Sequence, residues 1–358
     1  MNDRERFYSY MHYQKTDRIP FLEWNGPWEE TIQRWYMEGF PIGWRFDDYF
    51  GFDKRRETLP IDFGPIPQFV PRVLREDERY EVYIDTRGIV SRRLKAKETM
   101  PTWLEFPVKN RDDWEEMKSR FNPKDIRRYP KAWGDELIEY YNTLDHPVEL
   151  EFDGFFFFGR HLMGWQRLLT AFYRDPDLIH EIMDFWADFL VETFRKAVEN
   201  IKIDYAVFNE DLAYKNGPAI SPKIFEEFIL PNYKKVTSFL RSHGIDIIAM
   251  DSDGNFEVLI PLLLEGGINC LEPLEAAAGM DAVALREQYG KRLLLIGNID
   301  KLALVRGKKA IEKEVNRKFT LTQEGGYIPS IDHTISSDIP FKNYVYYINL
   351  YKAHLNTF

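Results

Sequence analysis

The sequence predicts an α/β fold in the form of a (β/α)₈ TIM barrel, with residues 1–358 as a single domain. Four short apolar runs are bounded by turn residues, as is typical of buried strands: Ile245–Met250, Gly267–Leu271, Leu293–Ile296 and Gly326–Pro329. Stretches of ten or more residues with helical character separate these runs, and such alternation indicates a parallel sheet. Acids and a histidine follow the runs, at the strand ends where barrels of this kind carry their active sites.

The first half of the chain supplies the remaining barrel elements and one insertion. Alternating residues on both sides of Gly88 predict a β-hairpin inserted near residues 78–97. Composition and turn signals predict, in order, a helix at 3–13, a strand at Arg18–Phe21, helices at 28–38, 110–119 and 130–144, a strand at Pro147–Phe152 and a loop at Asp153–Gly159.

The middle of the chain is predicted to be mainly helical, with one strand at Tyr205–Asn209. Ser221 followed by Pro222 is an N-cap with proline at the first helical position, and Pro231 is predicted to interrupt the helix that begins there. The other predicted helices are 163–173, 177–200, 233–243 and 341–354.

Composition excludes several classes of protein. The net charge is −10 and the pI about 5.4, and no block of lysine and arginine is long enough for nucleic-acid binding. No stretch approaches 18 uninterrupted apolar residues, and the N-terminal residues lack the apolar core of a signal peptide, so neither a membrane span nor secretion is expected. The single cysteine, Cys270, excludes an internal disulfide and fits a cytoplasmic location.

Charged residues gather at the predicted strand ends. They are Glu210, Asp211, Asp251, Asp253, Glu272, Glu275, Asp300, Asp332 and His333. Some have a structural alternative, because Asp253 or Asp300 can cap a helix and Glu275 can lie in the first turn of one. Several charges that converge on one place are costly to bury unless they bind something. That ligand is either a divalent metal held by oxygen and imidazole atoms, or a polar or cationic substrate.

Several motifs together resemble the uroporphyrinogen decarboxylase superfamily. The matching stretches are R-I-P near the start, S-P-K-I-F-E-E-F-I-L-P, D-S-D-G-N, E-P-L-E-A-A-A-G-M-D, G-N-I-D-K and D-H-T-I-S-S-D-I-P. The resemblance runs from about residue 3 to 352 and is dense after residue 200. It implies a (β/α)₈ barrel and either a decarboxylase or a methyltransferase that exchanges methyl groups with corrinoid proteins or thiols.

Departures from the family pattern narrow this choice. His333 falls where the decarboxylases carry a histidine, but F-L-E-W-N-G-P-W-E-E replaces their arginine-rich segment, which disfavours a substrate with eight carboxylates. Asp251 and Asp253 fall where the zinc-dependent thiol methyltransferases carry a His-x-Cys pair, and the cysteine expected around Asp332 is absent. Because thiolate-activating sites normally use soft ligands, a thiol substrate is also disfavoured.

The resemblance therefore implies a methyltransferase that moves a methyl group from a methyl ether, for example a methoxylated aromatic compound, to the cobalt(I) of a corrinoid on a partner protein. The expected catalytic residues are His333, Glu210 and Asp332. A divalent metal, with zinc as the first choice, is expected on Asp251, Asp253, Glu272 and His333. An aromatic substrate is expected to contact Trp24, Trp28, Phe155, Phe156, Phe158 and Trp165.

Two other functions remain open at this stage. One is decarboxylation of a porphyrinogen or a related acid, and the other is a non-catalytic barrel that binds a corrinoid or tetrapyrrole. The expected partners are the corrinoid-binding protein and the small-molecule methyl donor, with no nucleic acid and no membrane. A monomer or a homodimer is expected.

Overall fold

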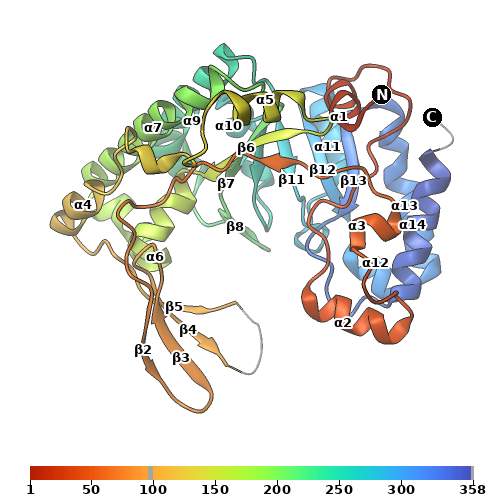
Figure 1. The fold of residues 1–358 in the computed structure, drawn as a ribbon, viewed down its shortest axis with the longest axis horizontal. Coiled ribbons are helices and arrows are strands. Elements are labelled where there is room, and N and C mark those ends of the chain that lie inside the picture. The colour runs from red at the N-terminus through yellow and green to blue at the C-terminus, as the bar shows by residue number, and fades with distance from the viewer. Residues whose placement is uncertain (96–99, 356–358) are drawn as a thin grey trace.

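A curled parallel sheet forms the centre of the protein in the computed structural model, which describes residues 1–95 and 100–355 (Figure 1). Among these residues the sheet has seven strands in the order β1-β6-β7-β10-β11-β12-β13. Their bounds are β1 Glu57–Thr58, β6 Val148–Asp153, β7 Tyr205–Asn209, β10 Ile248–Asp251, β11 Cys270–Glu272, β12 Leu294–Ile299 and β13 Tyr327–Ile331. The predicted α/β architecture with a barrel-like parallel sheet is confirmed, and its four C-terminal strands lie where the apolar runs predicted them.

The eighth strand position differs from the prediction. Residues 18–24 have no strand assignment and run as an extended segment beside β13. The Trp24 amide donates a hydrogen bond to Ser330 Oγ (2.9 Å), and the Tyr351 hydroxyl donates to the carbonyls of both Pro20 and Pro329 (2.9 and 3.1 Å). Proline has no N–H group to donate to a neighbouring strand. The segment is therefore held beside β13 by hydrogen bonds that involve side chains, and it does not pair with β13 as a strand.

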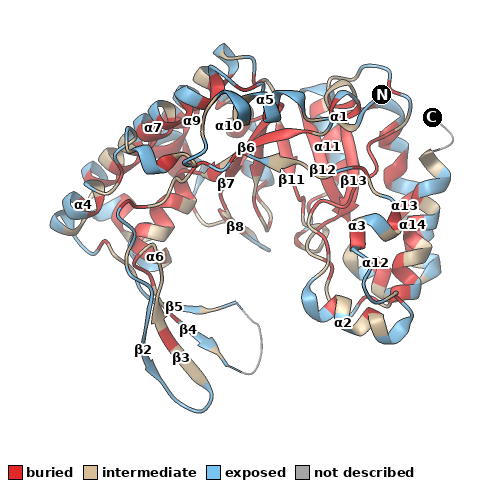
Figure 2. Cartoon of the chain, in the orientation of Figure 1, coloured by how far each residue is buried: buried red, intermediate tan, exposed pale blue. Residues whose placement is uncertain are grey.

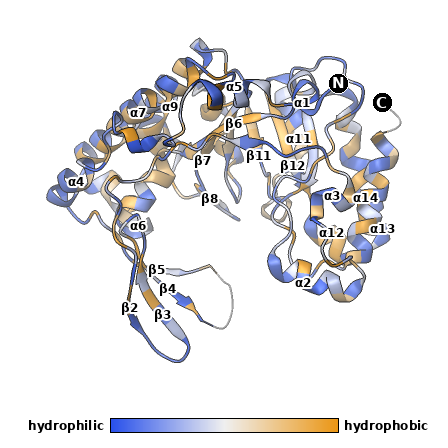
Figure 3. Cartoon of the chain, in the orientation of Figure 1, coloured by the Kyte–Doolittle hydropathy of each residue, from blue (hydrophilic) through white to orange (hydrophobic). Residues whose placement is uncertain are grey.

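Helices cover the sheet on its outer side (Figure 1). Along each strand, every second side chain packs against the outer helices. The side chains between them, such as Tyr205 and Ala249, point to the inner face of the curled sheet. In Figures 2 and 3 the central strands are largely buried and hydrophobic, and the outer helix surfaces are exposed and hydrophilic. The helix bounds are α1 Asp3–Met11, α2 Glu29–Glu38, α3 Phe46–Phe50, α4 Arg111–Lys118, α5 Asp135–Thr143, α6 Phe155–Arg174, α7 Pro176–Val198, α8 Pro222–Ile224, α9 Leu230–Ser242, α10 Ile260–Glu265, α11 Ala282–Tyr289, α12 Lys301–Arg306, α13 Lys308–Lys318 and α14 Phe341–Leu355.

An antiparallel sheet extends away from the parallel sheet (Figure 1). Its four described strands are β2 Arg72–Glu76, β3 Tyr80–Ile84, β4 Val90–Leu94 and β5 Thr102–Glu105, paired in that order. β3 and β4 pair as a hairpin across Gly88, within the predicted interval, and residues 96 and 97 of that interval lie outside the described residues. A short antiparallel pair, β8 Ala213–Tyr214 with β9 Gly217–Pro218, follows β7.

Two local predictions were wrong. The segment 153–159 is not a loop, because α6 begins at Phe155 immediately after β6. Pro231 does not interrupt its helix, because a π-helical turn at Phe225–Ile229 precedes it. In that turn the Leu230 amide bonds to the Phe225 carbonyl five residues back, and the wider turn accommodates the missing N–H of Pro231.

Candidate active site

Four polar side chains form a row at the carboxyl edge of the parallel sheet. The strand register aligns Asp153 of β6 with Asn209 of β7, Asn209 with Asp251 of β10, and Asp251 with Glu272 of β11. In parallel strands, residues in register point to the same face. The row therefore lies on the inner face, at the end of the barrel-like sheet where active sites of this architecture occur.

Asp251 and Glu272 hold their protons unusually tightly. Burial, together with the charges of Asp253 and Asp211, raises the pKa of Asp251 to about 7. Burial also raises the pKa of Glu272 well above its ordinary value, although the Arg56 charge and the Trp24 indole oppose this. Glu272 is 1% exposed, and its Oε2 has no hydrogen-bond partner among the described residues. Both carboxyl groups therefore keep their protons to a higher pH than is usual for these residue types.

A half-buried cation lies close to these carboxyls. The Arg56 guanidinium carbon is 4.3 Å from the centre of the Trp24 ring, and Arg56 Nε is 2.7 Å from Glu149 Oε2. The Tyr205 hydroxyl donates a hydrogen bond to the same Glu149 oxygen (2.5 Å). The sequence analysis missed Arg56 and Glu149. The signal for Glu149 was its place in V-E-L-E-F-D, where an acid at every second position puts all three on one face.

A second charged pair lies at the rim. His333 Nε2 is 3.6 Å from Asp253 Oδ2, and both side chains are partly exposed. The interaction between the two side chains raises the pKa of His333 and lowers that of Asp253. Asp253 does not cap the helix that follows, whose N-cap residue is Phe256. Glu275 accepts a hydrogen bond from the Gly254 amide (3.1 Å), which fixes the same loop.

The predicted metal ligands do not form one ligand set. They divide into Asp251 with Glu272 on neighbouring strands and Asp253 with His333 at the rim. In residues 1–95 and 100–355 no group of three or more histidine, cysteine, aspartate or glutamate side chains is arranged to hold a metal ion. Because a protein zinc site needs at least three protein ligands, the arrangement does not fit the expected zinc. Elemental analysis of the purified protein tests that prediction directly.

Glu210 and Asp332, both predicted to be catalytic, have structural roles. Glu210 is fully buried and accepts the backbone N–H groups of residues 155–157 at the start of α6 (2.8–3.1 Å), together with the Tyr233 hydroxyl. Asp332 is also fully buried and accepts the amides of Ala276 and Lys301 (2.9 and 3.1 Å), which ties together the loops after β11 and β12. Both carboxylates are occupied by backbone donors, so neither faces a substrate.

Most of the predicted aromatic contacts belong to the core. Phe155, Phe156 and Phe158 are at most 3% exposed, and Phe158 stacks on Trp186 with ring centres 3.8 Å apart. They lie in the first turn of α6, whose buried face joins the core. Trp28 precedes α2 and is 39% exposed. Of the predicted aromatic residues, Trp24 contacts the buried charges described above.

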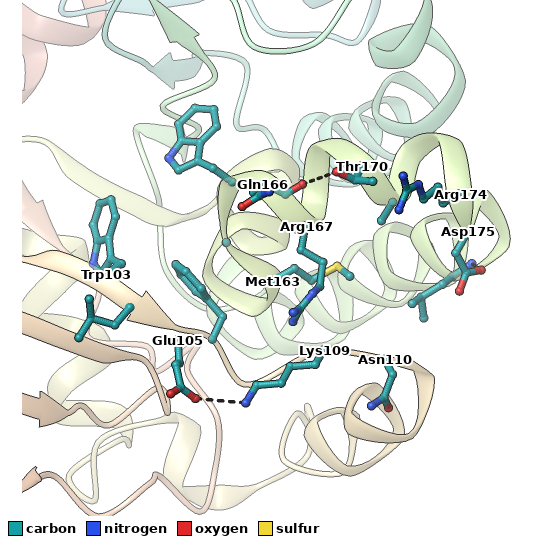
Figure 4. A pocket seen from close by; sticks show the side chains of 16 residues that line it. Trp103, Glu105, Lys109, Asn110, Met163, Gln166, Arg167, Thr170, Arg174 and Asp175 are labelled. Carbon is teal, nitrogen blue, oxygen red and sulfur yellow. Dashed lines mark hydrogen bonds and ion pairs between the residues drawn. The ribbon is translucent and has the colours of Figure 1, made fainter.

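A hollow of about 1000 Å³ forms a groove away from the carboxyl row (Figure 4). It lies between β5 with the segment that follows it and the second half of α6, and Trp103 and Trp165 line one end. Trp165 stacks on Tyr214, and Arg160 lies over the Trp165 ring at 5.2 Å. None of the strand-end acids lines this groove.

A smaller hollow, of about 360 Å³, adjoins the carboxyl row. It is bounded by Glu151, Asp153 and Asn209 at the ends of β6 and β7, by residues 61–65 and Gln68, and by the turn between β3 and β4. Asn209, one of its lining residues, lies in register with Asp251 on the neighbouring strand. Its volume is in the range of small-molecule sites.

A parallel α/β sheet with proton-donating carboxyls and a hollow at its carboxyl edge is the arrangement of an enzyme active site. The sequence from residue 158 to 354 matches the family model described as "Uroporphyrinogen decarboxylase (URO-D)". The match covers more than half of the chain, and the chain belongs to this family.

Known proteins resemble the chain in sequence and in fold. The uroporphyrinogen decarboxylase of Campylobacter lari is 24% identical over 185 residues, and that of Bordetella petrii is 26% identical over 196 residues. These matches cover 50–51% of this chain, and the chain spans about half the length of these curated relatives. A solved structure described as a methyltransferase from Methanosarcina mazei has the same fold, with a TM-score of 0.63, 16% identity and 99% of both chains covered. Among the described residues no helix is long and apolar enough to span a membrane.

Proposed function

We propose that the protein is a methyltransferase that takes a methyl group from a methyl ether and passes it to the cobalt(I) of a corrinoid bound to a partner protein. One observation carries the proposal: Asp251 and Glu272 lie side by side at the carboxyl edge, where burial raises the pKa of both carboxyl groups. The full-length likeness of fold to a methyltransferase supports it. The corrinoid supplies the nucleophile, so no serine or cysteine nucleophile is needed.

The carboxyl pair matches the difficult step of this reaction. When the methyl carbon is attacked, its bond to the ether oxygen breaks and the bonding electrons stay on that oxygen. An alkoxide or phenolate is a poor leaving group unless it receives a proton as the bond breaks. Asp251 is partly exposed and can donate that proton, which yields a neutral alcohol or phenol. Its neighbour Glu272 is buried and also carries a raised pKa. This chemistry requires no metal.

The same residues argue against a porphyrinogen substrate. Decarboxylation of an octa-acid requires cationic side chains that neutralise its carboxylates. The Arg56 cation is already paired with Glu149 and is not free to neutralise a substrate carboxylate.

The direct test is a methyl-transfer assay on the purified protein with a cob(I)alamin carrier and a panel of methyl ethers. Appearance of the demethylated alcohol or phenol together with methylated carrier is expected. Release of carbon dioxide from a porphyrinogen, with no transfer from any ether, would overturn the proposal. Tight binding of a corrinoid with neither reaction would instead favour a carrier role.

The rate of methyl transfer is expected to fall as the pH rises through about 7. Asp251 donates a proton only in its neutral form, and its pKa of about 7 sets the midpoint of the loss. A pH–rate profile of single-turnover transfer checks this, and a flat profile from pH 6 to 9 would show that no such acid takes part.

Replacing His333 by glutamine is expected to slow transfer about 10-fold, less than a full acid–base contribution. His333 is paired with Asp253 and partly exposed, so its charge acts on the site from the rim through a solvated environment. The measurement is the rate at two salt concentrations. The difference between wild type and variant should shrink in high salt, and an unchanged rate at low salt would make the histidine structural.

A further inference from the structure

The hollow of about 360 Å³ beside Asn209 has a size that limits its ligand. An apolar cavity of about 150 Å³ holds a benzene molecule. The hollow therefore accommodates one substituted ring, whereas a tetrapyrrole with four rings would need roughly 600 Å³ on the same scale. Phe63 and Ile61 supply apolar wall, and Gln68 and Asn209 supply polar groups.

The charges around the hollow are unbalanced. Three acids line it, Asp62, Glu151 and Asp153, against one cation among the described lining residues, Arg87. Burial favours the neutral form of Asp153, but the hydrogen bond with His161 and the charge of Arg87 outweigh it and lower its pKa to about 2. Asp153 is therefore an anion at every physiological pH.

The cation of the hollow is already engaged. Arg87 Nη1 lies 2.6 Å from Asp153 Oδ2 and also contacts His161 Nδ1, so its charge is paired with that of Asp153. Asn209 Nδ2 donates a hydrogen bond to Glu151 Oε1 (2.8 Å), which positions that carboxylate without neutralising it. An anionic ligand would thus meet the carboxylates of Asp62 and Glu151, and the described lining residues offer it no unpaired cation.

We propose that this hollow binds the methyl donor and accepts a single-ring ligand that carries no negative charge, so that carboxylated methoxyarenes are rejected. The inference rests on the proposed function, because the donor's methyl group must reach Asp251, which lies in register with Asn209. Rejection follows from like-charge repulsion in a partly buried site, where charges interact more strongly than in water.

Two ligands of nearly equal shape test this directly. Titration calorimetry on the full chain, without the corrinoid partner, compares 3-methoxybenzamide with 3-methoxybenzoate at low ionic strength. The Kd for the benzoate is expected to be at least about 30-fold higher than that for the amide, given several kcal/mol for juxtaposed like charges. Values within threefold of each other, or no binding of either ligand, would overturn the inference.

A charge-neutral variant shows whether the acids cause the preference. Glu151→Gln keeps a side chain of the same size and is expected to lower the ratio of the two Kd values about 5- to 10-fold. Asp62→Asn serves as a second variant if Glu151→Gln does not fold. Glu199→Gln is the matched control: Glu199 lies on the surface after α7, so its replacement should leave the ratio of the two Kd values unchanged. A wild-type ratio in both Glu151→Gln and Asp62→Asn would refute the electrostatic cause. Selective binding without any methyl transfer would count against the proposed reaction alone.

Discussion

Asp251→Asn is expected to lower the rate of methyl transfer by about 10²- to 10⁴-fold, the contribution of a positioned general acid. The amide has nearly the shape of the neutral carboxyl group but cannot give up a proton to the leaving oxygen. Since Asp251 keeps its proton up to a pH of about 7, the variant replaces a neutral group by a neutral group. Folding should therefore be preserved, and the loss should appear in kcat more than in KM.

The measurement is single-turnover transfer by the variant and by Asp188→Asn. Asp188 lies on the surface of α7, where it pairs with Lys235, so the same chemical change there should leave the rate as it is. A methyl donor with a better leaving group needs less protonation, so it should recover part of the lost rate in Asp251→Asn. A variant that keeps more than a tenth of the wild-type rate would show that Asp251 is not the acid.

The sequence predicts the carboxyl edge well because of how parallel sheets are built. β10 and β11 are consecutive strands that pair directly, so acids at their ends are bound to be neighbours. The pairing of Asp251 with Glu272 follows from this local order. The neighbouring hollow does not, because its walls come from residues 61–68 and the turn at Arg87, whose positions depend on tertiary contacts.

The errors have a common physical cause. Glu210 and Asp332 follow strands as Asp251 does, but backbone N–H groups of the adjoining loops and helices occupy their oxygens. Whether a strand-end acid contacts a substrate or a helix N-terminus depends on the elements that surround it in the fold. The residue type and its position in the sequence do not reveal these elements. Likewise, a run of phenylalanines has the same composition in a core as in a pocket wall.

Arg56 was missed for a different reason. It precedes β1, which contains only two residues, and no hydrophobic periodicity marks a strand of that length. From the absence of arginine in residues 21–30 the sequence predicts only that a substrate with eight carboxylates is disfavoured. The fold brings Arg56 onto the Trp24 ring from 32 residues further along the chain.

Glu210→Ala is expected to destabilise the protein by about 3–5 kcal/mol, the range for removing one partner of a buried charged network. The substitution leaves three backbone N–H groups at the start of α6 and the Tyr233 hydroxyl without an acceptor. Gly154 shows how closely the carboxylate fits, because a Cβ at that position would lie 2.3 Å from the Glu210 carboxyl carbon. Urea unfolding, with the exposed Glu265→Ala as control, measures the effect, and a loss under 1 kcal/mol would contradict this role.

Glu210 should also give stability an identifiable pH dependence. Burial raises its pKa to about 7 in the folded protein, above the ordinary 4.5, although the Tyr233 hydroxyl and the backbone donors oppose this. Between these two values the folded state binds the proton that the unfolded state releases. The contribution of Glu210 is therefore complete below pH 4.5 and declines by roughly 3 kcal/mol as the pH rises to 7. Asp251 and Asp332, with raised pKa values of about 7 and 6, act in the same direction. The difference in unfolding free energy between pH 5.5 and 8 should shrink in Glu210→Gln, because glutamine does not titrate, and an undiminished difference would assign the effect to the other acids.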